Sequence, residues 1–175
     1  MDTFFHLLYN NNMAKPFLSV IIPAFNEASR LPLTLIDVDR HLTEQGHTHE
    51  IIVVNDGSTD HTGEIVKRFA SLMKQVKYVS QDTNMGKGAA IRIGMLAAKG
   101  TWRLAMDADN SISIVELMKM LPTMKNGAAE ILIGVRRGKG SVSTGEAFIN
   151  ALGRIMLKIE AHDALAGFKC YRGDV

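Results

Sequence analysis

The chain has 175 residues, of which 46% are hydrophobic and 22% charged, and its formal net charge at pH 7 is +2. This length suits one folded domain that buries roughly 70% of the surface of its unfolded chain. The composition is typical of a globular protein, which argues against a disordered chain and against a basic tail that binds nucleic acid. Cys170 is the only cysteine, so neither an intrachain disulfide nor a metal site built from cysteines can form.

The first residues contain a short apolar run at 4–9. This run is too short for a membrane span or a signal peptide, and no other stretch approaches the roughly 18 apolar residues that a span requires. We predict that residues 1–15 form a flexible leader and that residues 16–175 form the folded domain. A short anchor at the membrane surface is the alternative for the leader. The lone cysteine and the absence of a targeting segment predict a cytoplasmic location.

Strands and helices are predicted to alternate along the chain. Continuous apolar runs predict strands at 18–22, 51–54, 76–80, 101–106, 129–135 and from 167 onward, and Pro23 is expected to end the first. Helical spacing predicts helices at 31–45, after Asp60 with Ile65, Phe69 and Leu72, at 88–98 with Ile93, Leu96 and Ala97 on one face, at 114–124 and at 148–161. Continuous apolar strands are typical of a sheet that is covered on both faces. We therefore predict an α/β fold in one domain, with a mostly parallel, Rossmann-like sheet and helices on both faces.

Polar side chains follow three of these strands, within residues 23–27, 55–60 and 107–109. Parallel strands end at one edge of the sheet, so Glu27, Asp56, Asp107 and Asp109 are expected to line one cleft there. If the chain stays extended, Asp107 and Asp109 point the same way and can present oxygens to one hard cation. Because an acidic cleft needs a cation to bind a diphosphate, we predict a Mg²⁺ or Mn²⁺ site at these two residues.

Some of these polar residues have purely structural interpretations. Asp56 is also typical of a turn in which Gly57 supplies a positive φ. Glu27 can serve as a charge in the first turn of a helix, and Asp60 as a helix cap. His61 is predicted to lie at the surface. His162 and Asp163 are neighbours whose side chains point apart in extended chain, which disfavours an acid–base pair.

The segment 84–88, Asn-Met-Gly-Lys-Gly, precedes a predicted helix. Its backbone amides and the side chain of Lys87 could contact a phosphate at the helix N-terminus. Its spacing is not that of a P-loop, and no Gly-x-Gly-x-x-Gly follows the first strand, which argues against a dinucleotide-binding dehydrogenase.

Five motifs occur in an order that resembles the family 2 glycosyltransferases of the GT-A fold. They lie at 20–27, 53–60, 84–92, 107–109 and 167–169, and the resemblance covers about residues 17–175. It is greatest for the branch of the family that transfers a hexose to dolichyl phosphate.

The resemblance implies a nucleotide-diphosphate-sugar donor, either a UDP- or a GDP-hexose. The residues implied to bind it are Pro23, Ala24, Glu27, Asp56, Lys87, Asp107 and Ala108. Asp107 and Asp109 would hold the metal, and Asp109, Asp163 and Arg136 would have catalytic roles, with Arg136 and Lys87 near the phosphates. The implied reaction is a direct displacement at the anomeric carbon with inversion, in which a polyprenyl phosphate at the cytosolic face of a membrane accepts the sugar.

Two positions depart from the pattern of the family. Ser111 stands where mannosyltransferase relatives have a side chain better suited to complete the metal site. The predicted helix near 144–150 lacks the arginine found in relatives that use a lipid phosphate, although Arg154 follows. A hydroxyl of a growing glycan is therefore an alternative acceptor, with Asp163 as its general base.

The last predicted strand begins close to Val175, so we expect the C-terminal part of the domain to be missing. A nucleotide-sugar-binding fragment without catalysis is accordingly a second hypothesis for the whole chain. A nucleotidyltransferase, which would share the sheet and the use of a metal, is a third.

Overall fold

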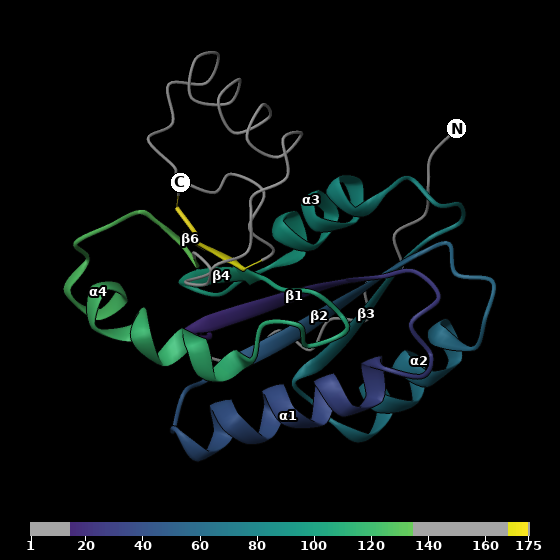
Figure 1. Ribbon diagram of the computed structural model, residues 1–175, viewed down its shortest axis with the longest axis horizontal. Coiled ribbons are helices and arrows are strands. Elements are labelled where there is room, and N and C mark those ends of the chain that lie inside the picture. The colour runs from purple at the N-terminus through teal and green to yellow at the C-terminus, as the bar shows by residue number, and fades with distance from the viewer. Residues whose placement is uncertain (1–14, 135–167, 175) are drawn as a thin grey trace, which may run out of the picture.

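The computed structural model describes residues 15–134 and 168–174, which contain a six-stranded sheet flanked by helices (Figure 1). The strand order is β3-β2-β1-β4-β6-β5. The strands are β1 Leu18–Ala24, β2 His49–Asp56, β3 Val76–Gln81, β4 Trp102–Ala105, β5 Ile131–Ile133 and β6 Lys169–Arg172. The first four are parallel, and β6 lies antiparallel between β4 and β5.

Helices cover both faces of the sheet. They are α1 Leu31–Glu44, α2 Thr62–Leu72, α3 Lys87–Ala97, the 3-10 helix η1 Ile114–Lys119 and α4 Leu121–Asn126. Figure 1 shows α3 on one side of the sheet and α1, α2 and α4 on the other. The predicted α/β fold, with a mostly parallel sheet and helices on both faces, is thereby confirmed. No helix among the described residues is both long enough and apolar enough to cross a bilayer.

The strand β1 lies inside the sheet and contributes to both cores. Leu18, Val20 and Ile22 are buried in the core shared with α1, whereas Ile21 is buried in the core that includes Ala90 of α3. Successive side chains of a strand point to opposite faces, so a continuous apolar run is what a doubly covered strand requires. The β-branched sequence of this strand thus explains its central position.

The first strand does not end at Pro23 as predicted, because β1 continues to Ala24. Proline has no backbone N–H and is tolerated in a sheet only where no hydrogen bond is lost. The strand β4 pairs with β1 only as far as Ala105, which lies opposite Ile21. Pro23 therefore lies beyond the part of β1 that has β4 as a neighbour.

The single helix predicted at 114–124 is wrong, since the chain forms η1 and then α4, with Met120 between them. Pro122 lies in the first turn of α4, where its missing N–H is tolerated, but it could not lie within a longer helix. The apolar side chains of this segment still pack in the core, because Leu117, Leu121 and Met124 are buried.

Two leucines assigned to helix faces by spacing are exposed instead. Leu72 of α2 is 75% exposed and Leu96 of α3 is 72% exposed. The buried residues of α2 are Thr62 and Val66, and those of α3 are Ala90 and Gly94. The predicted leader, apart from Lys15, and the predicted helix at 148–161 lie outside the described residues.

Gly94 allows α3 to lie close to the sheet. A Cβ atom at this position would lie 2.3 Å from Cγ2 of Ile21 and 3.1 Å from Cγ2 of Val54. Both neighbours are buried and cannot easily move.

We expect Gly94→Ala to lower the free energy of unfolding by about 1–3 kcal/mol, because overpacking outweighs the gain in helix propensity. The control is Gly88→Ala in the same helix, where an added Cβ meets nothing within 4 Å, and this change should be neutral or stabilise by up to about 1 kcal/mol. Urea denaturation of the two variants gives the comparison. Equal stabilities would contradict the close packing of α3.

Glu50 forms a buried network at the edge of the sheet where the parallel strands begin. Its side chain accepts hydrogen bonds from the Ser19 hydroxyl at 2.5 Å and from the Lys99 amide at 2.6 Å, and it pairs with Lys77. Burial alone would raise the pKa of Glu50, but the hydrogen bonds from Lys77, Ser19 and Lys99 outweigh it and hold the pKa below its ordinary value.

A group whose pKa is lowered by folding stabilises the protein above its ordinary pKa, and this contribution is lost as the pH falls through the lowered value. We therefore expect the free energy of unfolding to fall below about pH 4.5, the ordinary pKa of the glutamate. Glu50→Gln should lower stability at pH 7 by about 1–3 kcal/mol and flatten this acid dependence. Glu64→Gln, at an 81% exposed side chain, should do neither. Denaturation curves between pH 3 and pH 7 provide the measurement.

Candidate functional site

The loops that follow the parallel strands meet at one edge of the sheet, around an open cavity of about 290 Å³. The cavity is lined by Pro23, Ala24, Phe25, Asp56, Asn84, Gly86 and Lys87. Four residues that the sequence assigned to one site, Pro23, Ala24, Asp56 and Lys87, are thus brought together from three separate segments. The ends of parallel strands are where open α/β sheets bind ligands, so this edge is the candidate site.

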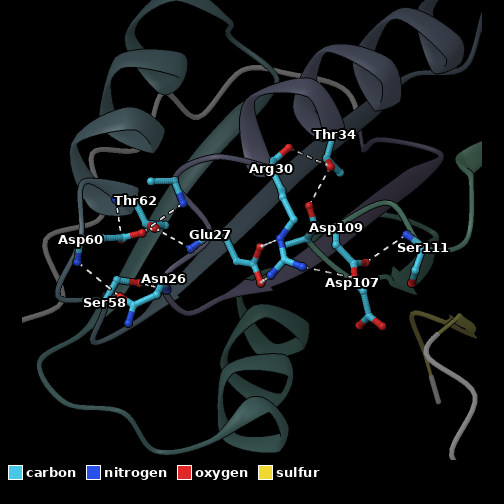
Figure 2. Close-up of polar contacts among 12 residues, drawn as sticks. Asn26, Glu27, Arg30, Thr34, Ser58, Asp60, Thr62, Asp107, Asp109 and Ser111 are labelled. Carbon is cyan, nitrogen blue, oxygen red and sulfur yellow. Dashed lines mark hydrogen bonds and ion pairs between the residues drawn. The ribbon is translucent and has the colours of Figure 1, made fainter.

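The loop after β1 is fastened to the loop after β2 through Asn26 (Figure 2). The side-chain oxygen of Asn26 accepts hydrogen bonds from the amides of Thr59 at 2.9 Å and Asp60 at 3.3 Å. In the reverse direction, the Asn26 amide donates to the Ser58 hydroxyl at 3.0 Å. Asn26 has a φ of +55°, a left-handed conformation that asparagine tolerates better than most residues.

Asp60 and Thr62 extend the connection between the same two loops. The carboxylate of Asp60 accepts from the amide of Ala28 at 3.2 Å and from the amide of Thr62, the first residue of α2, at 2.9 Å. The Thr62 hydroxyl in turn accepts from the amide of Glu27 at 2.9 Å. The N-cap residue of α2 is His61 and not Asp60 as predicted, but the Asp60 carboxylate still binds the first amide of the helix and also holds the neighbouring loop. His61 is exposed as predicted.

Asp56 ends β2 inside the site and is only 3% exposed. Its Oδ1 atom accepts from the side-chain amide of Gln81 at 2.7 Å and from the backbone amide of Met85 at 2.8 Å. Gly57 follows with a φ of +66°, and a Cβ there would lie 2.5 Å from the carbonyl carbon of Thr83. The expected turn is thus present, and the Asp56 carboxylate also fixes the loop that leads to Lys87.

Asp107 and Asp109 lie in a turn and not in extended chain, so the alternation of side chains along a strand does not determine which way they point. The strand β4 ends at Ala105, the Asn110 amide donates to the Asp107 carbonyl at 3.4 Å, and Asn110 has a φ of +54°. Ala108 is buried, and its carbonyl accepts from the Thr34 hydroxyl at 2.7 Å. The turn that carries both carboxylates is therefore fixed to α1.

Basic side chains lie against both carboxylates. The ammonium group of Lys87 is 2.5 Å from Oδ1 of Asp107, and Nη1 of Arg30 is 3.8 Å from Oδ2 of Asp109. Arg30 also donates two hydrogen bonds to Glu27, at 2.6 and 2.7 Å. Because Lys87 lines the cavity and contacts Asp107, the Asp107 carboxylate lies beside the cavity. Of the four acidic residues expected to line one cleft, only Asp56 lines this cavity.

Asp109 is held in its ionised form. The backbone amide of Ser111, which donates to Oδ1 at 3.0 Å, lowers the pKa of Asp109 most, and the charge of Arg30 lowers it further against partial burial. Side chains that stay ionised at neutral pH suit the binding of a cation.

The donor set at this turn fits a magnesium or manganese ion bound together with a ligand. No group of three His, Cys, Asp or Glu side chains able to hold a metal occurs among residues 15–134 and 168–174. Mg²⁺ is usually held by one or two carboxylates, water and substrate phosphates rather than by a complete protein cage. The partly exposed carboxylates of Asp107 and Asp109 meet that requirement.

The sequence did not single out Arg30, Thr34 or Phe25. Glu27 and Arg30 are three residues apart with opposite charges, a spacing that could have indicated their pairing. Phe25 is 43% exposed in the cavity wall, although large apolar side chains are usually buried. Glu27 precedes α1 and pairs with Arg30, so it is not a charge within the first turn of that helix. Arg136, Arg154, His162 and Asp163 lie outside the described residues.

Comparisons with known proteins place these features in a family. The model of the family described as glycosyl transferase family 2 matches residues 19–172. A dolichyl-phosphate beta-glucosyltransferase of Trichomonas vaginalis is 37% identical over 129 residues, which are 69% of this chain and 39% of that protein. The enzyme of the same name from Saccharomyces cerevisiae is 36% identical over 111 residues, 60% of this chain and 33% of its own length. The chain therefore spans well under half the length of these relatives.

Solved structures share the fold. Mannosyl-3-phosphoglycerate synthase from Rubrobacter xylanophilus matches with a TM-score of 0.70 and 20% identity, over 91% of this chain and 54% of that one. A mannosyltransferase from Pyrobaculum calidifontis, in complex with GDP-Man and Mn²⁺, matches with a TM-score of 0.62 and 21% identity, over 91% and 45% of the two chains. These are glycosyltransferases of the GT-A fold, and at such identities the likeness shows the fold alone.

Asn26 provides a test of the connection between the two loops. We expect Asn26→Ala to lower the free energy of unfolding by about 1–2 kcal/mol, because hydrogen bonds are lost and alanine is strained at a positive φ. Asn26→Gly also loses the side chain but tolerates this φ, so it should be more stable than Asn26→Ala by about 1 kcal/mol. Thermal and urea unfolding measure both changes, and wild-type stability in both variants would show that the contacts contribute nothing.

Proposed function

Since the chain belongs to glycosyl transferase family 2, we propose that its candidate site binds a nucleotide-diphosphate sugar together with a divalent cation, for transfer of the hexose to a polyprenyl phosphate. The observation that supports this most directly is the position of Lys87, which lines the cavity and contacts Asp107. One basic side chain thus lies between a cavity of about 290 Å³ and a pair of carboxylates. A nucleotide in the cavity would have its diphosphate near both.

The nucleoside would occupy the cavity beside Pro23, Ala24 and Phe25. Apolar atoms of these residues suit a flat base, and the exposed ring of Phe25 offers a surface for stacking. Asp56 lines the same cavity, with its Oδ1 atom already bound by Gln81 and Met85, so the carboxylate is fixed before a ligand arrives. A fixed acceptor costs little entropy on binding and is well suited to a base or a ribose hydroxyl.

The diphosphate would lie between Lys87 and the turn at residues 107–110. Asp107 and Asp109 would hold Mg²⁺ or Mn²⁺, and Ala108 would contribute through the backbone position that Thr34 fixes. A bound divalent cation supplies charge stabilisation for the departing diphosphate. Lys87 would add a positive charge at the same place, and Gly86, with a φ of +88°, lets the backbone before α3 turn there.

The proposed reaction is a direct displacement at the anomeric carbon. An oxygen of the acceptor forms the new C–O bond as the bond to the diphosphate oxygen breaks, and the configuration at the anomeric carbon inverts. A phosphate acceptor is already an anion, so its attack does not require a strong general base. We assign Arg136 to the departing phosphates and Asp163 to positioning the acceptor, from the sequence pattern.

The acceptor proposed here is a lipid phosphate because the curated relatives named above are dolichyl-phosphate glucosyltransferases. A lipid acceptor would place the reaction at a membrane surface, and a nucleotide-sugar donor would place it on the cytosolic side. UDP-glucose and GDP-mannose are both donors to be tested.

The first test is calorimetric titration of the chain with UDP-glucose and with GDP-mannose, each with and without Mn²⁺. We expect one donor to bind with Mn²⁺ and at least tenfold more weakly without it, because the cation offsets the repulsion between diphosphate and carboxylates. Asp109→Asn should abolish the effect of Mn²⁺. Asp174→Asn, after β6 at the opposite edge of the sheet, should bind as the wild type does.

Binding of neither donor in the presence of Mn²⁺ would refute the proposed function. If a donor binds, transfer of labelled hexose to a polyprenyl phosphate is measured next. Binding without any transfer would favour a nucleotide-sugar-binding fragment over an enzyme, and pyrophosphate release from a nucleoside triphosphate would favour a nucleotidyltransferase.

A further inference from the structure

Arg30 lies between two carboxylates that come from different parts of the chain (Figure 2). Its Nε and Nη2 atoms donate to the two oxygens of Glu27, at 2.7 and 2.6 Å, in a bidentate arrangement. Its Nη1 atom is 3.8 Å from Oδ2 of Asp109. The guanidinium group therefore links the loop after β1 to the turn after β4.

The position of Arg30 is fixed on both sides. Arg30 immediately precedes α1, and its carbonyl accepts from the amide and the hydroxyl of Thr34. The same Thr34 hydroxyl binds the Ala108 carbonyl at 2.7 Å, so the start of α1 and the turn that carries Asp109 are held together. Bidentate pairing with Glu27 limits the freedom of the guanidinium further.

The charges of this cluster suggest what Arg30 does. The three carboxylates of Glu27, Asp107 and Asp109 face two basic side chains, Arg30 and Lys87. A divalent cation alone would leave the cluster with a net positive charge and would lie close to a guanidinium that cannot lose its proton. A nucleoside diphosphate arriving with the cation would make the cluster net negative again.

We propose that Arg30 is a positioning residue that makes binding of the divalent cation at Asp109 dependent on the diphosphate. This inference rests on the proposed function. The positive charge of Arg30 repels a cation that arrives alone, and the negative charge of the phosphates offsets this repulsion. Lys87 has a different proposed role, because it lines the cavity and is assigned to binding the phosphates themselves.

The matched control for Arg30 lies on α1, the helix that Arg30 precedes. Arg40 pairs with Asp37 at 2.9 Å, and its partner lies three positions earlier in the sequence, as Glu27 does for Arg30; the side chain of Arg40 is 65% exposed against 56% for Arg30. Within the part of the chain that the structure describes, Arg40 neither lines the cavity nor pairs with Asp107 or Asp109. Arg40→Gln therefore removes a similar surface ion pair and leaves the guanidinium beside Asp109 in place.

The experiment is a titration with Mn²⁺, carried out once without nucleotide and once with saturating UDP or GDP. The paramagnetic signal of free Mn²⁺ measures how much of the ion is bound. The coupling is the ratio of the two Mn²⁺ dissociation constants. For Arg30→Gln we expect Mn²⁺ alone to bind about three- to tenfold more tightly, with little change when nucleotide is present, so the ratio falls. Arg30→Lys, which keeps the charge, should retain most of the ratio, and Arg40→Gln should retain all of it.

The outcomes distinguish failure of the role of Arg30 from failure of the proposed function. If Arg30→Gln leaves the ratio of the two Mn²⁺ dissociation constants unchanged, this inference is overturned and the proposed function still stands. This holds even if both dissociation constants change by the same factor, because a purely structural effect acts on both titrations. Failure of the wild type to bind Mn²⁺ under either condition, or wild-type binding by Asp109→Asn, would overturn both. A wild-type ratio that is lost only in Arg30→Gln supports the inference, and the difference should shrink at high salt.

Discussion

The architecture depends on the double burial of β1. This strand has α1 on one face and α3 on the other, with β2 and β4 as its neighbours in the sheet. A parallel arrangement around it directs the ends of the neighbouring strands toward one edge, so the loops there must meet. The candidate site is a consequence of this packing, because residues 23–27, 56 and 107–109 lie at the ends of strands that pair with or include β1, or directly after those ends.

Hydrogen bonds between neighbouring loops fix the shape of the candidate site. Asn26, Asp60 and Thr62 join two loops through backbone amides, and Thr34 joins α1 to the turn at residues 107–110. Hydrogen bonds to backbone groups do not depend on the neighbour's side chain, so the shape of the edge is fixed independently of the charges placed on it. The backbone positions that carry the charged groups are therefore set before a ligand arrives, as a pre-organised binding site requires.

The apolar strands and the polar residues at their ends could be predicted from the sequence because both follow from local patterns. The family resemblance rested on the same segments. What could not be predicted depends on contacts between distant segments: the insertion of β6 beside β4, the exposure of Leu96, and the pairing of Arg30 with Asp109. Spacing placed Leu96 on one helix face with Ile93 and Ala97, but only Ile93 and Ala97 pack against the core beneath α3.

The place of β6 has a consequence for the order in which the protein folds. Among the described strands, β5 pairs only with β6, and β6 lies between β5 and β4, although residues 169–172 follow β5 distantly in sequence. During synthesis, β1 to β4 can therefore assemble first, while the open edge of β4 and the whole of β5 wait for β6, which emerges later. A long-range closure of this kind is slow, and until it occurs the exposed strand edges are open to association with other chains.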